Sequence, residues 1–209
     1  MSEVSHRIPV ESFFLEALYE EGRSPETVVV CHPHPLYGGS MDNNVISAMM
    51  KPVRDRGWGT LRFNFRGVGE SGGKYGEGEG EVADVLAVAS YLVDHGIGTI
   101  HLAGYSFGAW IALKAIQKRL PAASLILASP PLDLLPFRGL VLPAKPCLMT
   151  LGDSDGFCSV RSLTDWIASQ PYGESFVELD ILSGCDHFYW GHEETLSRYV
   201  AEFLEHGFK

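Results

Sequence analysis

The chain has 209 residues, of which 45% are hydrophobic and 20% are charged, and its formal net charge is −10. This length and composition predict a single globular domain over residues 1–209 with its own apolar core. The negative charge and the absence of any basic run argue against a nucleic-acid partner, because phosphate binding requires clustered Lys and Arg.

The first residues, MSEVSHRIPVESFF, lack the basic and apolar regions of a secretory signal. No stretch of the sequence approaches the roughly 20 apolar residues of a membrane span. None of the four cysteines falls in a Cys-x-x-Cys pair, which favours buried thiols in a reducing compartment. We therefore expect a cytoplasmic protein without a membrane partner, and the sequence leaves a monomer and a homodimer equally open.

Hydrophobic periodicity predicts strands and helices in alternation. Residues 12–20 have the mixed pattern of an edge strand, whereas 27–32 (TVVVCH) form a β-branched run typical of a strand covered on both faces. Further strands are predicted at 59–65, 98–106, 124–131, 146–155 and 175–187. Helices are predicted at 40–57, 81–96, 107–121, 159–170 and 192–207. This order predicts an α/β fold with a mainly parallel sheet, helices on both faces and a ligand site at the carboxyl ends of the strands.

The strongest chemical signal is the pentapeptide GYSFG at 104–108, which fits G-x-S-x-G between a predicted strand and a predicted helix. This context is typical of a nucleophile elbow, a sharp turn that exposes a serine hydroxyl, here that of Ser106. The backbone N–H of Phe107, at the start of the helix, would then point towards an oxyanion formed on a substrate.

A serine hydroxyl needs a neighbouring base before it becomes a good nucleophile. His187 is the preferred base, because it lies on the loop between the last predicted strand and the last predicted helix. His192, five residues further on, is the weaker choice.

The acid that would orient this histidine is less sharply defined. Asp153 and Asp155 both follow a predicted strand, and Asp186 lies beside His187. Asp155 is preferred because it lies further out on the turn, where its side chain can reach across the sheet edge. Asp153 is expected to bind backbone N–H groups of its own loop instead.

The chain resembles the small α/β-hydrolases without a lid domain, in the dienelactone-hydrolase-like group, over nearly its whole length. The motifs that carry the resemblance are HPHPLYGG, FNFRGVGESGG, GYSFGA, GDSD and CDHF. It implies that the loop HPHPLYGG supplies a second oxyanion N–H, from His34 or, as runner-up, Leu36. Pro33 and Pro35 lack an N–H and stiffen this loop, and His32 is expected to brace it by hydrogen bonding.

Two departures from the family pattern matter. Dienelactone hydrolase uses a cysteine nucleophile, whereas this chain has Ser106, so no lactone substrate follows. The Val-Pro pair that often follows the family's acid is replaced by Gly156 and Phe157, which weakens the assignment of Asp155.

Two other motifs have competing interpretations. The His-x-His of HPHPLYGG suggests a zinc site, for which His, Asp and Cys residues near other strand ends are available: His32, His34, Asp153, Asp155, Cys185, His187 and His192. No His-x-x-x-His or Cys-x-x-Cys supports it, and we expect neither a metal nor another cofactor. GVGESG at 67–72 matches a dinucleotide-binding pattern, but the helix is predicted to begin only near Glu81, too late for that motif.

These residues predict a serine hydrolase that cleaves small soluble carboxylic esters or thioesters through an acyl-enzyme. Only residues 130–146 connect two strands where a lid is usually inserted, so an open site is expected, with an apolar rim from Leu36, Tyr37, Phe107, Phe157, Phe188, Tyr189 and Trp190. Tyr37, Phe157 and Phe188 are the predicted substrate contacts. The alternatives are a non-enzymatic scaffold for binding, and acyl transfer or perhydrolysis on the same triad.

Overall fold

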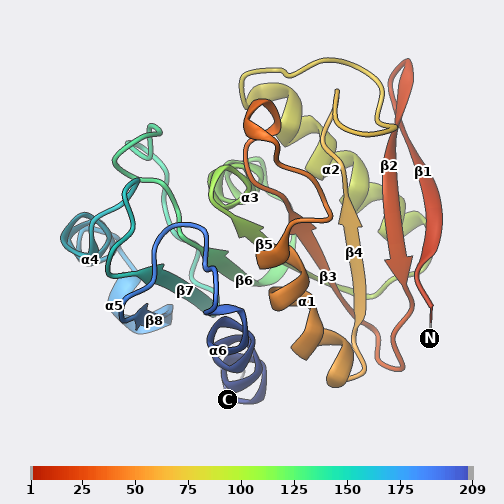
Figure 1. The fold of residues 1–209 in the computed structure, drawn as a ribbon. Helices are drawn as coiled ribbons and strands as arrows, with labels where there is room; N and C mark the ends of the chain where they lie inside the picture. The colour runs from red at the N-terminus through yellow and green to blue at the C-terminus, as the bar shows by residue number, and fades with distance from the viewer. Residues whose placement is uncertain (1, 207–209) are drawn as a thin grey trace.

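The computed structural model describes residues 2–206 and, within them, has one eight-stranded sheet with helices on both faces (Figure 1). The strands are β1 (Val4–Val10), β2 (Phe13–Glu20), β3 (Glu26–Cys31), β4 (Gly59–Phe63), β5 (Thr99–Tyr105), β6 (Ala122–Ala128), β7 (Cys147–Gly152) and β8 (Val177–Leu182). Their order in the sheet is β1-β2-β4-β3-β5-β6-β7-β8. The β1–β2 and β2–β4 pairs are antiparallel and all other pairs are parallel, as the predicted α/β class requires.

The helices divide between the two faces of the sheet. They are α1 (Asn44–Asp55), α2 (Glu79–Asp94), α3 (Phe107–Gln117), α4 (Val160–Ala168), α5 (Gly173–Phe176) and α6 (Glu193–His206), with a 3-10 turn η1 (Pro35–Tyr37). α1 and α6 share one apolar cluster, and α2, α3 and α4 share the other (Figure 1). In β3, Val28 and Val30 belong to the first cluster and Val29 and Cys31 to the second, because successive side chains of a strand point to opposite faces. A strand covered on both sides therefore needs the continuous apolar run that identified it.

The antiparallel end of the sheet corrects one prediction. The predicted edge strand is β2, but it lies between β1 and β4, and the edge belongs to β1. Only Ile8 and Val10 of β1 are buried, and the strand contains Pro9, which cannot donate a ladder hydrogen bond. Such a strand carries little apolar signal, so periodicity did not reveal it.

The helix boundaries follow local capping. The Asn43 side chain accepts from the Val45 N–H at 2.9 Å and begins α1. Gly57 follows this helix with a φ of 82°, a left-handed conformation that glycine adopts without strain. Helix α2 begins at Glu79, well beyond the glycines of GVGESG, so the dinucleotide geometry does not form there.

The parallel strands bring their carboxyl ends to one edge of the sheet. The loops after β3, β5, β7 and β8 meet at this edge, which is where an α/β sheet binds ligands. The connection from β6 to β7 contains no helix or strand of its own. Among the helices of residues 2–206, none combines the length and apolar character needed to cross a membrane.

Candidate active site

Ser106 lies on a strained turn between β5 and α3. Its φ is 55° and its ψ is −119°, a combination that an L-residue adopts only when its surroundings enforce it. Gly104 and Gly108, two residues on either side, allow the close packing that holds Ser106 in this conformation. A Cβ on Gly104 would lie 2.4 Å from the Gly108 carbonyl oxygen, and one on Gly108 would lie 2.1 Å from the Cys31 carbonyl oxygen. Strand, turn and helix can therefore approach this closely only without side chains at these two positions.

Three side chains from separate loops form a chain of hydrogen bonds. His187 Nε2 lies 2.8 Å from Ser106 Oγ, and His187 Nδ1 lies 2.7 Å from Asp155 Oδ2. Ser106 follows β5, Asp155 follows β7 and His187 follows β8, so parallel strands deliver all three to one edge. With the proton on Nδ1 held by the carboxylate, Nε2 has its lone pair directed at the serine hydroxyl.

Asp155 is a buried carboxylate with both oxygens occupied. Oδ1 accepts from the N–H groups of Phe157 at 2.8 Å and Cys158 at 3.2 Å, while Oδ2 faces His187. Burial raises the pKa of Asp155, but the hydrogen bond and charge of His187, the Phe157 N–H and the Ser129 hydroxyl together lower it below its ordinary value. The group is therefore ionised although its side chain is fully shielded from solvent.

A second layer of polar groups that the sequence analysis missed supports this triplet. The Tyr105 hydroxyl donates to the His187 carbonyl at 2.8 Å and fixes the loop that carries the imidazole. The Tyr189 hydroxyl lies 3.0 Å from both Ser129 Oγ and Thr150 Oγ1, beneath the Asp155 loop. The only sequence signal for this layer was the placement of hydroxyl residues at the ends of β6 and β7.

The competing acids form hydrogen bonds with other groups, and the competing base lies just before α6. Asp153 Oδ1 accepts from the Gly184 N–H of the neighbouring loop at 2.8 Å and from the Ser154 hydroxyl at 3.0 Å, so its backbone partner is not in its own loop, where it was predicted. Asp186 Oδ1 accepts from the Phe188 N–H at 2.9 Å. His192 precedes α6, and its backbone N–H donates to the Tyr189 carbonyl at 2.9 Å.

The loop HPHPLYGG folds around His34. The backbone carbonyl of His34 accepts from the N–H groups of Tyr37 and Gly39, both at 3.1 Å, and its Nδ1 accepts from the Leu36 N–H at 3.2 Å. Three N–H groups of the loop, including that of the runner-up Leu36, are thus directed at His34. Among the hydrogen bonds of residues 2–206, none has the His34 N–H as its donor. The N–H of Phe107, at the first position of α3, has no acceptor within its helix.

His32 braces this loop, as predicted. Its ring is fully buried, with Nδ1 2.6 Å from the Pro33 carbonyl and Nε2 accepting from the Phe65 N–H at 3.0 Å. Burial lowers the pKa of His32 to about 4, which leaves the ring neutral, and both nitrogens are occupied. In the part of the chain that the structure describes, no three His, Cys, Asp or Glu side chains are grouped so that they could share a metal ion.

A pocket of about 520 Å³ opens above Ser106 and His187. The predicted contacts Tyr37, Phe157 and Phe188 all line it. Its walls come from the HPHPLYGG loop, the start of α1, the turn at Ser106, the β6–β7 connection and the loops after β7 and β8: Pro33, His34, Tyr37, Gly38, Gly39, Asn43, Tyr105, Ser106, Phe107, Pro131, Leu134, Leu135, Phe157, His187 and Phe188. The wall from Pro131, Leu134 and Leu135 was missed, because that connection has no periodicity to indicate which side chains turn inwards.

Three residues of the predicted apolar rim lie outside this pocket. Tyr189 is fully buried, because a φ of 59° turns it under the sheet edge to its hydroxyl partners. Leu36 and Trp190 are 66% and 70% exposed and do not line the pocket. The prediction placed them by sequence proximity alone.

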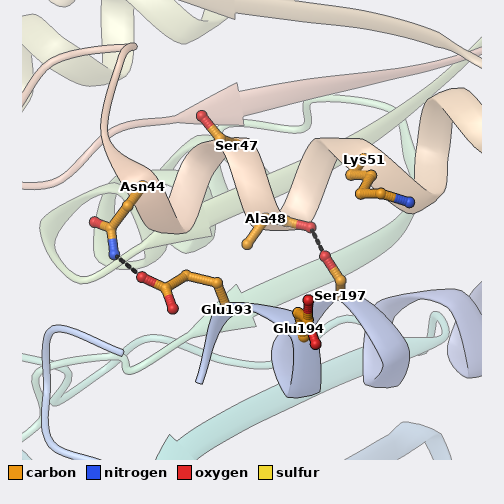
Figure 2. A pocket seen from close by; sticks show the side chains of 7 residues that line it. All are labelled: Asn44, Ser47, Ala48, Lys51, Glu193, Glu194 and Ser197. Carbon is orange, nitrogen blue, oxygen red and sulfur yellow. Dashed lines mark hydrogen bonds between the residues drawn. The ribbon is translucent and has the colours of Figure 1, made fainter. Parts of the chain in front are cut away.

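A second hollow, between α1 and α6, lacks an activated nucleophile (Figure 2). Ser197 Oγ donates to the Ala48 carbonyl at 2.6 Å and Ser47 Oγ to the Asn43 carbonyl at 3.2 Å, so neither hydroxyl faces a base. Asn44 connects this hollow to the first pocket, since its amide donates to Glu193 at 3.0 Å and to the Phe188 carbonyl at 3.2 Å. Asn44, at the edge of this hollow, therefore helps to hold the loop after His187.

Comparisons with known proteins agree with this architecture. A family model described as the alpha/beta hydrolase family matches residues 28–180. An uncharacterized protein of Rickettsia prowazekii is 33% identical over 199 residues, which cover 91% of this chain and 84% of that protein. A solved alpha-beta serine hydrolase homologue from Coxiella burnetii has a TM-score of 0.89 and 34% identity, covering 98% of both chains. A serine hydrolase without a lid from Xanthomonas campestris has a TM-score of 0.87 and 30% identity, covering 99% of this chain and 94% of the other. The chain belongs to the alpha/beta hydrolase family, in the lidless form that its motifs predicted.

Proposed function

We propose that this protein is a serine hydrolase that cleaves small carboxylic esters or thioesters through an acyl-enzyme. The observation that carries the proposal is the continuous chain Asp155–His187–Ser106, with contacts of 2.7 and 2.8 Å, at the floor of an apolar pocket. The solved relatives from Coxiella burnetii and Xanthomonas campestris, both described as serine hydrolases, support it.

In the proposed reaction, Ser106 Oγ attacks the substrate carbonyl carbon and its proton passes to His187 Nε2. The carbonyl oxygen becomes an oxyanion that accepts from the N–H groups of Phe107 and His34, and losing one such donor typically costs about 10²–10³ in rate. The tetrahedral intermediate collapses, and His187 gives its proton to the departing alcohol or thiol. Water, deprotonated by His187, then attacks the acyl-enzyme and releases the acid.

The pocket supports a neutral, compact acyl group. None of the residues that line it is Lys, Arg, Asp or Glu, so an acyl chain with its own charge would lose hydration without gaining an opposite charge. Leu134 is 61% exposed and Tyr37 84% exposed, so the pocket opens directly to solvent and offers a long acyl chain little apolar cover.

The test combines covalent labelling with turnover. A fluorophosphonate probe should label wild-type protein at Ser106, located by mass spectrometry, and should fail to label Ser106→Ala. Ser197→Ala, which removes a hydroxyl from the second hollow, should label like the wild type. Activity on p-nitrophenyl esters should be highest for acetate and butyrate and fall for decanoate. An unlabelled and inactive wild type would support the alternative of a non-enzymatic scaffold.

A further inference from the structure

The His34 imidazole packs against the rings of Tyr75 and Phe107, which also contact each other with centroids 6.1 Å apart. Its ring centroid is 4.7 Å from that of Phe107 and 5.1 Å from that of Tyr75. The Tyr75 hydroxyl lies 3.2 Å from His34 Nε2. Because His34 Nδ1 accepts from the Leu36 N–H, a neutral ring carries its proton on Nε2, which donates to the Tyr75 oxygen. Both ring nitrogens thus hold the imidazole in a single orientation.

Tyr75 comes from the glycine-rich segment 67–80, which has no dinucleotide geometry and no other role in the proposed reaction. The Glu81 carboxylate holds this segment, accepting from the N–H groups of Gly76 at 2.8 Å and Gly78 at 2.7 Å. Glu81 is fully buried. A Cβ on Gly78 would lie 2.5 Å from the Trp110 ring, so the segment packs tightly on α3, the helix that begins with Phe107. Tyr75 is therefore supported by the same helix that carries one proposed oxyanion donor.

We propose that Tyr75 is a positioning residue, which acts through the His34 imidazole to fix the His34 backbone N–H relative to that of Phe107. This inference rests on the proposed serine-hydrolase function. Phe107 is set by α3, whereas His34 lies in a loop whose N–H groups at Leu36, Tyr37 and Gly39 all donate to His34 itself. The Tyr75 and Phe107 rings supply the connection from that loop to the helix.

The energetic reason is the geometry of an oxyanion hole. Both donors must lie about 2.7–3.1 Å from the oxyanion, and a displacement of about 1 Å at an active site can cost up to about 10²-fold in rate. Burial lowers the pKa of His34, against a smaller opposing effect of Glu81, and so keeps the Nδ1 lone pair available for the Leu36 N–H. Tyr75 lies behind His34, outside the pocket lining, so its removal changes no substrate contact.

The first test is Tyr75→Phe in the full-length protein, which keeps the ring and removes the hydroxyl. With p-nitrophenyl acetate we expect kcat to fall about tenfold and KM to stay within twofold, because both acylation and deacylation pass through an oxyanion. The inhibition constant of a trifluoromethyl ketone, which forms an oxyanion with the serine, should rise by the same factor. The affinity for the matching secondary alcohol, which forms none, should not change.

A matched control exists away from the site. The Tyr91 hydroxyl lies 2.8 Å from His6 Nδ1, where α2 meets β1, so Tyr91→Phe removes the same kind of Tyr–His contact. Tyr91→Phe should keep wild-type kcat, KM and ketone affinity, with a loss of melting temperature similar to that of Tyr75→Phe.

The second test asks whether Tyr75 acts through His34. His34→Phe keeps a ring against Tyr75 and Phe107 but removes both nitrogens. In this background, adding Tyr75→Phe should lower kcat less than twofold, since the partner of the hydroxyl is gone. An equal loss in both backgrounds, or a Tyr75→Phe protein with wild-type kcat, would overturn the inference. Fluorophosphonate labelling of wild-type Ser106 distinguishes a failure of the proposed function from a failure of the Tyr75 inference. An unlabelled wild type would overturn both, whereas a labelled wild type with an unaffected Tyr75→Phe protein would overturn only the inference.

Discussion

Replacing Asp155 by Asn exchanges one carboxylate oxygen for an NH₂ group. This exchange reverses the direction of the hydrogen bond between residue 155 and His187 Nδ1 in the proposed triad. Oδ1 of Asp155 accepts from two backbone N–H groups, those of Phe157 and Cys158, while Oδ2 faces His187. An asparagine keeps one oxygen, and the two N–H groups require it on their side. Its NH₂ group then points at His187 Nδ1, which must offer a lone pair and place its proton on Nε2. A protonated Nε2 cannot accept the proton of Ser106.

The size of the effect follows from the cost of the opposite orientation. Turning the amide would direct its NH₂ at the N–H groups of Phe157 and Cys158 and leave both without an acceptor. Each donor left without an acceptor beside this fully shielded side chain costs about 1–3 kcal/mol, so the unproductive tautomer is favoured by about 2–6 kcal/mol. A bias near the middle of this range, with 1.36 kcal/mol per factor of ten, predicts a loss of about 10³-fold in kcat.

The assay is steady-state hydrolysis of p-nitrophenyl acetate, with the rate of fluorophosphonate labelling as a second readout. Asp153→Asn is the matched control, because Asp153 is an exposed carboxylate two residues away that accepts from the Gly184 N–H and the Ser154 hydroxyl and not from His187. It should keep kcat within twofold. An Asp155→Asn protein that retains more than about a tenth of wild-type kcat would refute the reasoning, as would a larger loss from Asp153→Asn.

Three further predictions concern the framework of the site. Gly108→Ala should lower the unfolding free energy by about 3 kcal/mol or more, because its Cβ would lie 2.1 Å from a backbone oxygen. The control is Gly98→Ala, whose Cβ has no neighbour closer than 3.7 Å and which should change the unfolding free energy by less than about 0.5 kcal/mol. Urea denaturation measures both. Burial lowers the pKa of His32 from 6.5 to about 4, so the unfolded state binds more protons between these values, and the contribution of His32 to stability should fall by about 2 kcal/mol from pH 7.5 to pH 5. His32→Gln should remove this part of the pH dependence, and an unchanged slope would contradict the assignment. Ser129→Ala should lower kcat about three- to tenfold and raise the pKa of Asp155, followed by the chemical shift of its carboxyl carbon, because the Ser129 hydroxyl is one of the groups that lower it.

The fold was predictable where one residue type dominated a whole element. The β-branched run of β3 and the amphipathic pattern of α6 each indicate a surface that must be covered, so the parallel sheet followed from their order. The edge strand β1 was missed because only two of its residues, Ile8 and Val10, are buried. An edge strand is specified by its hydrogen bonds to β2, and these leave almost no trace in the sequence of β1.

The residues of the candidate site also differed in how far the sequence alone could predict them. Ser106 was identifiable because its strained turn requires glycines at fixed offsets, and these can be read directly from the sequence. The sequence favoured Asp155 over Asp153 only by its position on the turn, because side-chain direction there depends on contacts with other loops. Tyr189 was predicted at the rim for the same reason, since an aromatic run does not reveal which residue takes a positive φ.

The buried polar groups around Asp155 keep its carboxylate charged, which proximity to His187 alone would not do. Moving a carboxylate out of water disfavours its charge, and here hydrogen bonds from backbone N–H groups and from Ser129 and His187 more than offset that cost. The carboxylate is therefore charged before any substrate arrives, in surroundings where water screens it little. When His187 takes the proton of Ser106, an imidazolium forms 2.7 Å from this charge, so the attraction is strongest at the step in which the new charge appears. An exposed carboxylate at the same distance would be screened by water and would stabilise that step less.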